Sequence, residues 1–174
     1  MGLNKDSVRL ENFSTNWKEM YLEEEKKLKE LIGDYILSIE HVGSTSIPNL
    51  KSKPIIDIAI TVNELNDALK FSELLDNNWY EFRYDNGIEN EYFVRKGTPD
   101  NRTHYIHIVE KNSERLNNLI LFRNYMLKHP EEVINYQNLK EHLASIYSDN
   151  RKMYTSSKND YIQNILKLAK EEIE

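Results

Sequence analysis

The spacing of apolar residues predicts a helix over Asn16–Ile32, because they recur at intervals of three and four while charged residues fill the other positions. Gly33 follows where a glycine commonly ends a helix. Two apolar runs with the character of strands come next, over Tyr35–Val42 and Lys53–Val62. Asn63 is then expected to cap a further helix that extends to about residue 75.

A second group of short strands follows, and the chain then becomes helical. The Asn86-Gly87 pair within DNGIEN predicts a turn between the first two of these strands, and the stretch GTPDNR predicts another turn-rich connection. The helical pattern begins at Ser113, is interrupted where Pro130 opens a new helix, and is interrupted again around residues 148–157. The three expected strands are Trp79–Tyr84, Glu91–Lys96 and His104–Glu110.

This order predicts one α/β (α+β) domain over residues 1–174, with a mixed sheet in about residues 1–112 and a helical half in about residues 113–174. A chain of 174 residues with 39% hydrophobic and 30% charged residues is long enough for one well-formed core. Cysteine is absent, which excludes disulfides and thiolate metal sites. We find no signal-peptide pattern and no apolar run near the ~20 residues of a membrane span, so we expect a cytoplasmic protein with no membrane partner.

The formal net charge of −6 bears on the partners. Proteins that bind long nucleic acids usually carry a basic surplus, because neutralising phosphates supplies much of the affinity. We therefore do not expect long DNA or RNA as the main partner. A local group of cations could still bind a small phosphorylated molecule.

Asp57 is the unusual residue of the second strand, Ile-Ile-Asp-Ile-Ala-Ile. Strand alternation places large apolar residues on one face and Asp57, Ala59 and Thr61 on the other. This second face is small and polar, as expected of a strand that lines a cleft. A buried carboxylate without a partner costs several kcal/mol, so Asp57 needs a cation, a metal ion or strong donors. A simple ion pair with Lys51, Lys53 or an arginine is the alternative.

His107 shares that face if its strand lies in the same sheet. Alternation places Tyr105 and His107 opposite to the apolar positions of the strand. Such a histidine is either a structural residue with satisfied hydrogen bonds, or a metal ligand or general base beside Asp57.

The Gly43-Ser44 turn precedes Asp57 and has the chemistry of a phosphate-binding loop. Glycine allows close approach of the backbone to a ligand, and the hydroxyls of Ser44 and Thr45 add donors. Lys53 either reaches a phosphate or is a solvated loop residue.

The segment HVGSTSIPNLKSKPIIDI, with twelve residues between Gly43-Ser44 and Asp57-Ile58, resembles the signature of the nucleotidyltransferase superfamily, and more closely the defining motif of the GrpB family (UPF0157). The runs HYIHIVE, LFRNYMLKHPEEVINYQNLK and RKMYTSSKNDYI are similar to that family as well. The resemblance implies a nucleotidyltransferase-like fold, a nucleoside triphosphate (NTP) as ligand and Mg²⁺ or Mn²⁺ held by carboxylates. The second carboxylate of the superfamily pattern is replaced by Ala59.

The resemblance extends the set of candidate residues. Arg123 either reaches a ligand or lies with a buried stem on its helix. Tyr154 and Lys158 are four residues apart and share a helix face, as cleft residues or as a surface pair. Glu91 or Glu110 supplies a further acid if the strand register permits.

Three functions are compatible with these residues. The first is transfer of a nucleoside monophosphate from an NTP to a small-molecule or protein acceptor, with Asp57 and His107 as catalytic residues and metal ligands. In that hypothesis Gly43, Ser44, Thr45, Lys53, Arg123, Tyr154 and Lys158 bind the nucleotide. The second is a nucleotide- or phosphate-binding module that has lost catalysis, which Ala59 suggests. The third is a hydrolytic enzyme that uses Asp57 and His107 as a pair.

Overall fold

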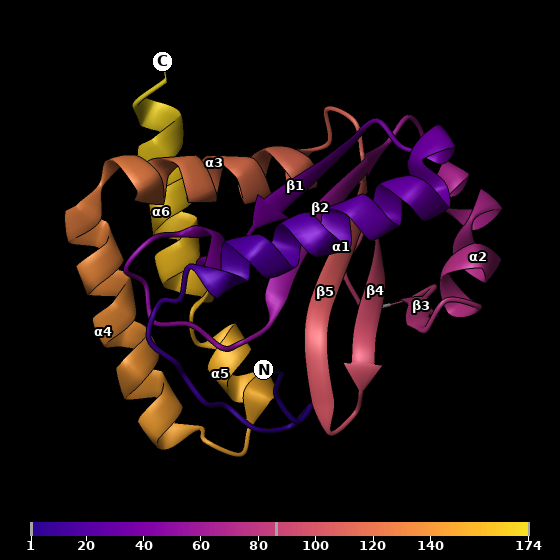
Figure 1. The fold of residues 1–174 in the computed structure, drawn as a ribbon. Coiled ribbons are helices and arrows are strands. Elements are labelled where there is room, and N and C mark those ends of the chain that lie inside the picture. Colours follow the sequence, from indigo (N-terminus) through magenta and orange to yellow (C-terminus); the bar gives the residue numbers. More distant parts are fainter. Residues whose placement is uncertain (1, 86, 174) are drawn as a thin grey trace.

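One mixed sheet lies at the centre of the computed structural model, which describes residues 2–85 and 87–173 (Figure 1). Its strands are β1 (Ser38–Val42), β2 (Ile56–Val62), β3 (Tyr80–Arg83), β4 (Glu91–Thr98) and β5 (Asn101–Glu110). The order across the sheet is β1-β2-β5-β4-β3. β2 and β5 are parallel, and the other neighbouring pairs are antiparallel. The expected mixed α/β fold is therefore confirmed.

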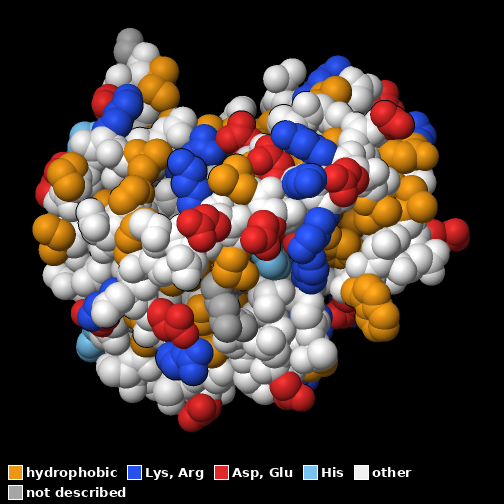
Figure 2. Space-filling view, viewed as in Figure 1, with side chains coloured by type: hydrophobic (Ala, Val, Ile, Leu, Met, Phe, Trp, Pro, Cys, Tyr) orange, Lys and Arg blue, Asp and Glu red, His pale blue; other side chains and the backbone are white. Residues whose placement is uncertain are grey.

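The helices cover the sheet unevenly. Figure 1 shows α1 across one face of the sheet, with α4, α5 and α6 gathered beyond the edge formed by β1. On the side that carries α1, acidic and basic side chains are intermixed over the surface (Figure 2). The helices are α1 (Asn16–Ile32), α2 (Ser72–Asp76), α3 (Glu114–Lys128), α4 (Pro130–Ile146), α5 (Arg151–Ser156) and α6 (Asn159–Glu171).

The main core fills the space between the sheet and the α1–α2 layer. Ile56, Ile58 and Ile60 of β2 are fully buried there, together with Trp17 and Leu28 of α1. The apolar face predicted from alternation in β2 is thus the core face. The opposite face of β2, which carries Asp57, is left for the site.

A second core joins the loop after β1 to the helical half. Ile47 and Leu50 of that loop are fully buried among residues of α3, α4 and α6, including Phe122, Tyr136 and Ile165. The loop that contains the Gly-Ser turn is therefore anchored by helices that come much later in the chain.

Two helices of the helical half begin where the sequence predicts. The Ser113 side chain accepts a hydrogen bond of 3.2 Å from the Leu116 amide and so caps α3. Pro130 occupies the first turn of α4, where its missing amide hydrogen has no helical partner to lose.

Several predicted boundaries in the first half are wrong. Gly33 has φ −54°, and the chain continues from it as a 3-10 turn over Gly33–Tyr35, so β1 begins only at Ser38. β2 begins at Ile56 because the Ile55 amide donates to the Lys53 carbonyl in a tight turn around Pro54. Pro54 itself has no amide hydrogen to offer a neighbouring strand.

The predicted Asn63 cap is also wrong. Glu64 is the N-cap residue, in a reciprocal capping box with Asp67, of a 3-10 helix over Leu65–Lys70. Asn63 instead accepts a hydrogen bond from Lys111. The single helix expected here is divided at Phe71 into this 3-10 helix and α2.

The second half of the sheet is longer than predicted. The stretch GTPDNR is largely strand, because β4 and β5 continue until Thr98 pairs with Asn101 around a tight turn. Of the predicted Asn-Gly turn, Asn86 lies outside the described residues. The expected break over residues 148–157 contains a short helix, α5, whose N-cap is Asn150.

Candidate functional site

Asp57 and His107 lie side by side on the face of the sheet opposite to α1. The parallel register pairs Ala59 of β2 with His107 of β5, and Asp57 lies two residues before Ala59 on the same face. Asp57 Oδ1 is 3.8 Å from His107 Nε2. The shared face predicted from alternation is confirmed. It depends on register, because a slip of one residue would turn His107 into the core.

A cavity of about 320 Å³ opens in front of this pair. Its floor is formed by β2 and β5, and its walls by the loop after β1, the start of α3, α4 and the region of α5. Seven of the nine predicted site residues line it: Ser44, Thr45, Lys53, Asp57, His107, Tyr154 and Lys158.

Gly43 does not line the cavity, but its backbone packs directly against the Asp57 side chain. Its φ is +68°, and a Cβ atom added there would lie 2.5 Å from Asp57 Oδ2. Only glycine therefore allows the backbone to pass so close to the Asp57 carboxylate. The Ser46 hydroxyl donates to the Gly43 carbonyl at 2.6 Å, and the Ser44 side chain lies close enough to the Tyr136 hydroxyl of α4 to oppose the rise that burial causes in the pKa of that tyrosine. The turn is thereby held at the cavity edge.

His107 is held by acids on two sides. Its Nδ1 lies 3.1 Å from Glu91 Oε1, and Glu91 Oε2 accepts a hydrogen bond of 2.6 Å from Arg115 Nε. Burial lowers the pKa of His107, but Asp57 and Glu91 outweigh it and raise that pKa to about 9. Burial raises the pKa of Glu91, but His107 and Arg115 outweigh it and lower that pKa to about 2. At neutral pH the imidazole is therefore protonated, and it cannot accept a proton as a general base.

Two lysines meet at the ring of Tyr154 on the opposite wall. Lys53 Nζ is 5.5 Å and Lys158 Nζ is 4.4 Å from the ring centroid. Burial, Lys158 and Arg151 lower the pKa of Lys53 to about 7. Burial lowers the pKa of Lys158 to about 8, with Asp57 opposing the shift. Burial and neighbouring cations therefore outweigh the nearby carboxylate of Asp57 at both lysines.

Arg151, which the sequence reasoning missed, is the most informative residue of the site. Its Nη1 donates to the Tyr105 hydroxyl at 2.5 Å, while its Nε and Nη2 are shielded from solvent and have no hydrogen-bond partner within residues 2–85 and 87–173. A guanidinium left in this state is costly, because buried donors are normally satisfied. Arg151 and Tyr154 are three residues apart on α5, and this spacing was a signal that could have identified Arg151. Lys158 lies beyond the end of α5, as the N-cap residue of α6, so the prediction that Tyr154 and Lys158 share one helix face is wrong.

Two further cations of the cavity, Arg115 and Lys140, were also missed. Lys140 of α4 is 1% exposed and donates to the Lys51 carbonyl and, at 3.4 Å, to Ser52 Oγ. Burial holds its pKa well below the usual range. A lysine in the middle of a helix gives no local sign that it will be buried.

Arg123 does not line the cavity. Its Nη1 pairs with Glu40 Oε2 at 2.7 Å and donates to the His41 carbonyl at 2.9 Å, so it joins α3 to β1. The prediction that Arg123 binds the ligand conflicts with this placement, because its charge is already paired with an acid. Glu110 also lies away from the cavity, whereas Glu91 lies behind His107.

The side chains present do not fit a divalent metal ion. Ala59 offers no second carboxylate, and both ring nitrogens of His107 face acids instead of an open position. Within residues 2–85 and 87–173 no three histidine, aspartate or glutamate side chains are grouped to hold a metal. The predicted metal-binding roles of Asp57 and His107 are therefore not supported by the geometry.

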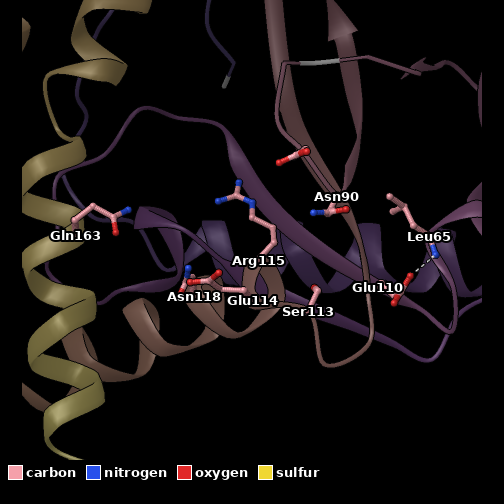
Figure 3. Close-up of a pocket in the computed structure, with 9 residues that line it drawn as sticks. Leu65, Asn90, Glu110, Ser113, Glu114, Arg115, Asn118 and Gln163 are labelled. Carbon is pink, nitrogen blue, oxygen red and sulfur yellow. Dashed lines mark hydrogen bonds between the residues drawn. The ribbon is translucent and has the colours of Figure 1, made fainter.

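A second pocket, of about 480 Å³, adjoins the cavity through Arg115. Figure 3 shows Arg115 rising from the start of α3 between Gln163 of α6 and Asn90, with Asn118 and Glu114 below it. Most of the side chains that line this pocket are acids and amides. The cavity around Asp57 differs from it in being lined mainly by cations and aromatic rings.

Comparison with known proteins identifies the family. The sequence profile of the GrpB protein family matches residues 7–168. The chain belongs to the GrpB family. The UPF0157 protein YqkA of Bacillus subtilis is 34% identical over 166 residues, which cover 95% of the chain and 48% of YqkA. The chain thus spans about half the length of that relative. The glutamate-rich protein GrpB of Alkalihalophilus pseudofirmus is 33% identical, over 95% of the chain and 98% of that protein.

Solved structures agree with the GrpB assignment and show the fold class. The crystal structure of the conserved protein GrpB from Enterococcus faecalis has a TM-score of 0.88 and 32% identity, covering 95% of this chain and all of that one. Cid1 in complex with the UTP analog UMPNPP has a TM-score of 0.53 and 12% identity, covering 77% of this chain and 42% of Cid1. The GrpB-family fold is therefore nucleotidyltransferase-like.

No helix within residues 2–85 and 87–173 combines the length and the apolar character needed to cross a membrane.

Proposed function

We propose that this protein binds a nucleoside triphosphate, with the phosphates in the cavity above Asp57. The observation that carries the proposal is Arg151, whose two shielded nitrogens have no hydrogen-bond partner among the residues that the structure describes. Lys53 and Lys158 add two ammonium groups with lowered pKa beside it. An anion with several oxygens would satisfy all three side chains at once, and phosphate matches the fork of a guanidinium.

The fold supports a nucleotide as the source of these phosphates. The neighbour Cid1 has been solved with a UTP analog and, in another structure, with MgGTP bound. The present chain carries its Gly43-Ser44 turn next to Asp57 on the nucleotidyltransferase-like sheet. In the proposal, Ser44 and Thr45 donate to phosphate oxygens at one side, and Arg151, Lys53 and Lys158 neutralise charge at the other.

Nucleotidyl transfer is the second candidate, favoured by the position of Asp57 beside the Ser44 turn. Asp57 would accept the proton of an acceptor hydroxyl as its oxygen bonds to the α-phosphorus. The bond to the bridging oxygen would break, and pyrophosphate would leave with its charge neutralised by the lysines and Arg151. In this candidate the protonated His107 orients Asp57 and is not the base. The same protonation argues against the hydrolytic Asp57–His107 pair.

Isothermal titration calorimetry with ATP, UTP, GTP and CTP tests the proposal. We expect at least one of them to bind, and Arg151→Met to weaken it by about 10- to 100-fold, since hydrogen bonds to charged groups contribute about 1.5–3 kcal/mol. Arg83→Met, at an exposed arginine of β3, is the matched control and should bind as the parent does. Failure of all four nucleotides to bind, or equal binding by both variants, would refute the proposal.

Release of pyrophosphate separates the two candidates. Incubation of each labelled NTP with the protein and a mixture of hydroxyl- and amine-bearing acceptors should yield pyrophosphate if transfer occurs. Binding by calorimetry without pyrophosphate would leave nucleotide binding as the function and would count against transfer.

A further inference from the structure

The cavity has an excess of positive charge at the position where a related fold would hold metal ions. Asp57 is the one acid among the described residues that line it, against five lysine and arginine side chains, of which Arg115 is paired with Glu91 behind the cavity. Position 59, which alternation places on the same face as Asp57, is an alanine. A divalent ion prefers several oxygen ligands, and this wall offers it a single carboxylate.

The Asp57 carboxylate is also engaged with a cation from the protein. His107 Nε2 stands 3.8 Å from Asp57 Oδ1, and His107 is fixed from behind by Glu91 and Arg115. The imidazole therefore occupies the side of Asp57 from which a bridging ion would have to reach β5. An ion entering there would have to displace a ring held between two acids.

The cations on the opposite wall come from three separate segments. Lys53 lies in the loop before β2, Arg151 begins α5, and Lys158 is the N-cap residue of α6. The two lysines share the ring of Tyr154, and the Tyr105 hydroxyl orients Arg151. Fixed ammonium and guanidinium groups placed in this way act on phosphate oxygens as a metal ion does, by opposite charge at short range.

We propose that the cavity binds the polyphosphate group of its nucleotide without a divalent metal ion, directly on Arg151, Lys53 and Lys158. The inference rests on the proposed function, because it concerns the form in which the nucleotide enters the same cavity. Mg²⁺ then competes with the lysines for the phosphates instead of assisting them. Asp57 repels the ligand's negative charge, where in a metal-dependent site it would attract the complex.

The first test is calorimetric titration of the intact protein with ATP, or with whichever NTP binds, in EDTA and again in excess MgCl₂. We expect the affinity in EDTA to equal or exceed that in MgCl₂. Binding that appears only with MgCl₂ would overturn this inference and leave the proposed function standing. The absence of binding under both conditions would refute the proposed function itself, so the two failures are distinguishable.

The second test uses Asp57→Asn, with Asp34→Asn at an exposed residue after α1 as the matched control. In EDTA we expect Asp57→Asn to bind ATP as tightly as the parent or up to tenfold more tightly, and the control to be unchanged. A loss of tenfold or more in correctly folded Asp57→Asn, checked by circular dichroism, would contradict the inference.

A measurement on the unmodified protein covers the case in which Asp57→Asn does not fold. Mn²⁺ enhances water-proton relaxation when it is held in a complex with a protein. We expect the protein to cause no enhancement beyond that of Mn²⁺ with ATP alone. A large enhancement that depends on both protein and ATP would show a bound metal and reject metal-free binding.

Discussion

Lys53 shows how the fold changes the pKa of a side chain that is normally charged and exposed to solvent. Burial and the charges of Lys158 and Arg151 lower its pKa to about 7, while Asp57 raises it to a smaller extent. A phosphate placed among these groups would return the pKa of Lys53 toward its normal value near 10.5. The bound state would then hold more protons than the free state between about pH 7 and pH 10.

From this sign we predict that nucleotide binding takes up protons and that affinity falls as the pH rises through this window. At pH 8, titrations in HEPES and in Tris should differ in heat by an amount equivalent to about one proton per nucleotide. Lys158→Met should reduce that uptake, and Lys152→Met, at an exposed neighbour, should not. Equal heats in the two buffers would show that these lysines do not sense the ligand.

His107 illustrates what could and could not be predicted at the level of single residues. Alternation along two strands was enough to place it on the Asp57 face, because side-chain direction in a strand has a fixed period of two. Its charge could not be predicted, because the raised pKa depends on Asp57 and Glu91 together, and Glu91 comes from β4, whose register with β5 the sequence does not give. Arg151 was missed for a related reason: its environment is supplied by Tyr105, 46 residues away.

At the level of elements, the short helix α5 has the greatest influence on the site. It carries Arg151 and Tyr154 and is only six residues long, too short to be stable by itself. The Asn150 side chain caps it by accepting a hydrogen bond of 3.1 Å from the Met153 amide. The position of Arg151 therefore depends on one cap and on the burial of the Tyr154 ring.

We predict that Asn150→Ala increases hydrogen exchange of the α5 amides by about fivefold, since the loss of an N-cap costs about 1 kcal/mol. Asn150→Ser, which restores a capping oxygen, should return exchange to the parent rate. Amides of β2 should be unaffected in both variants. Unchanged exchange in Asn150→Ala would mean that packing alone holds α5 in place.

Element boundaries were predicted less well than the elements themselves. The helix Asn16–Ile32 was placed correctly because a long apolar stripe defines it. The Asn63 cap was wrong because the adjacent Glu64 and Asp67 form a capping box, and caps are decided by local geometry that several residues can satisfy. β4 and β5 were predicted too short because pairing with each other extends them through residues of low strand propensity.

For the whole molecule, the packing of Ile47 and Leu50 among α3, α4 and α6 joins the two halves. The loop that carries them also carries Gly43 and Ser44, so the site and the second core share one segment. A single domain over residues 1–174 stays a prediction, which unfolding experiments can test.

We therefore expect one cooperative unfolding transition in urea. Trp79 is 90% exposed, so the fluorescence of the buried Trp17 is measured in a Trp79→Phe background. This signal and far-ultraviolet circular dichroism, which is dominated by the helices, should give coincident curves. Leu50→Ala should lower the free energy of unfolding by about 2–5 kcal/mol and should shift both curves to lower urea concentration by the same amount. Two separate transitions would show that the sheet half and the helical half are independent units.

The sequence by itself determined the long helix Asn16–Ile32, the apolar face of β2, the position of Asp57 on the other face and the relationship to the GrpB family. These features depend on short-range periodicity and on motifs whose residues are close in the chain. Only the tertiary structure decided that β5 pairs with β2, that Arg151 and Lys158 stand opposite Asp57, and that His107 is protonated. Strand pairing and the pKa of a buried group depend on segments that are distant in sequence, which no local pattern specifies.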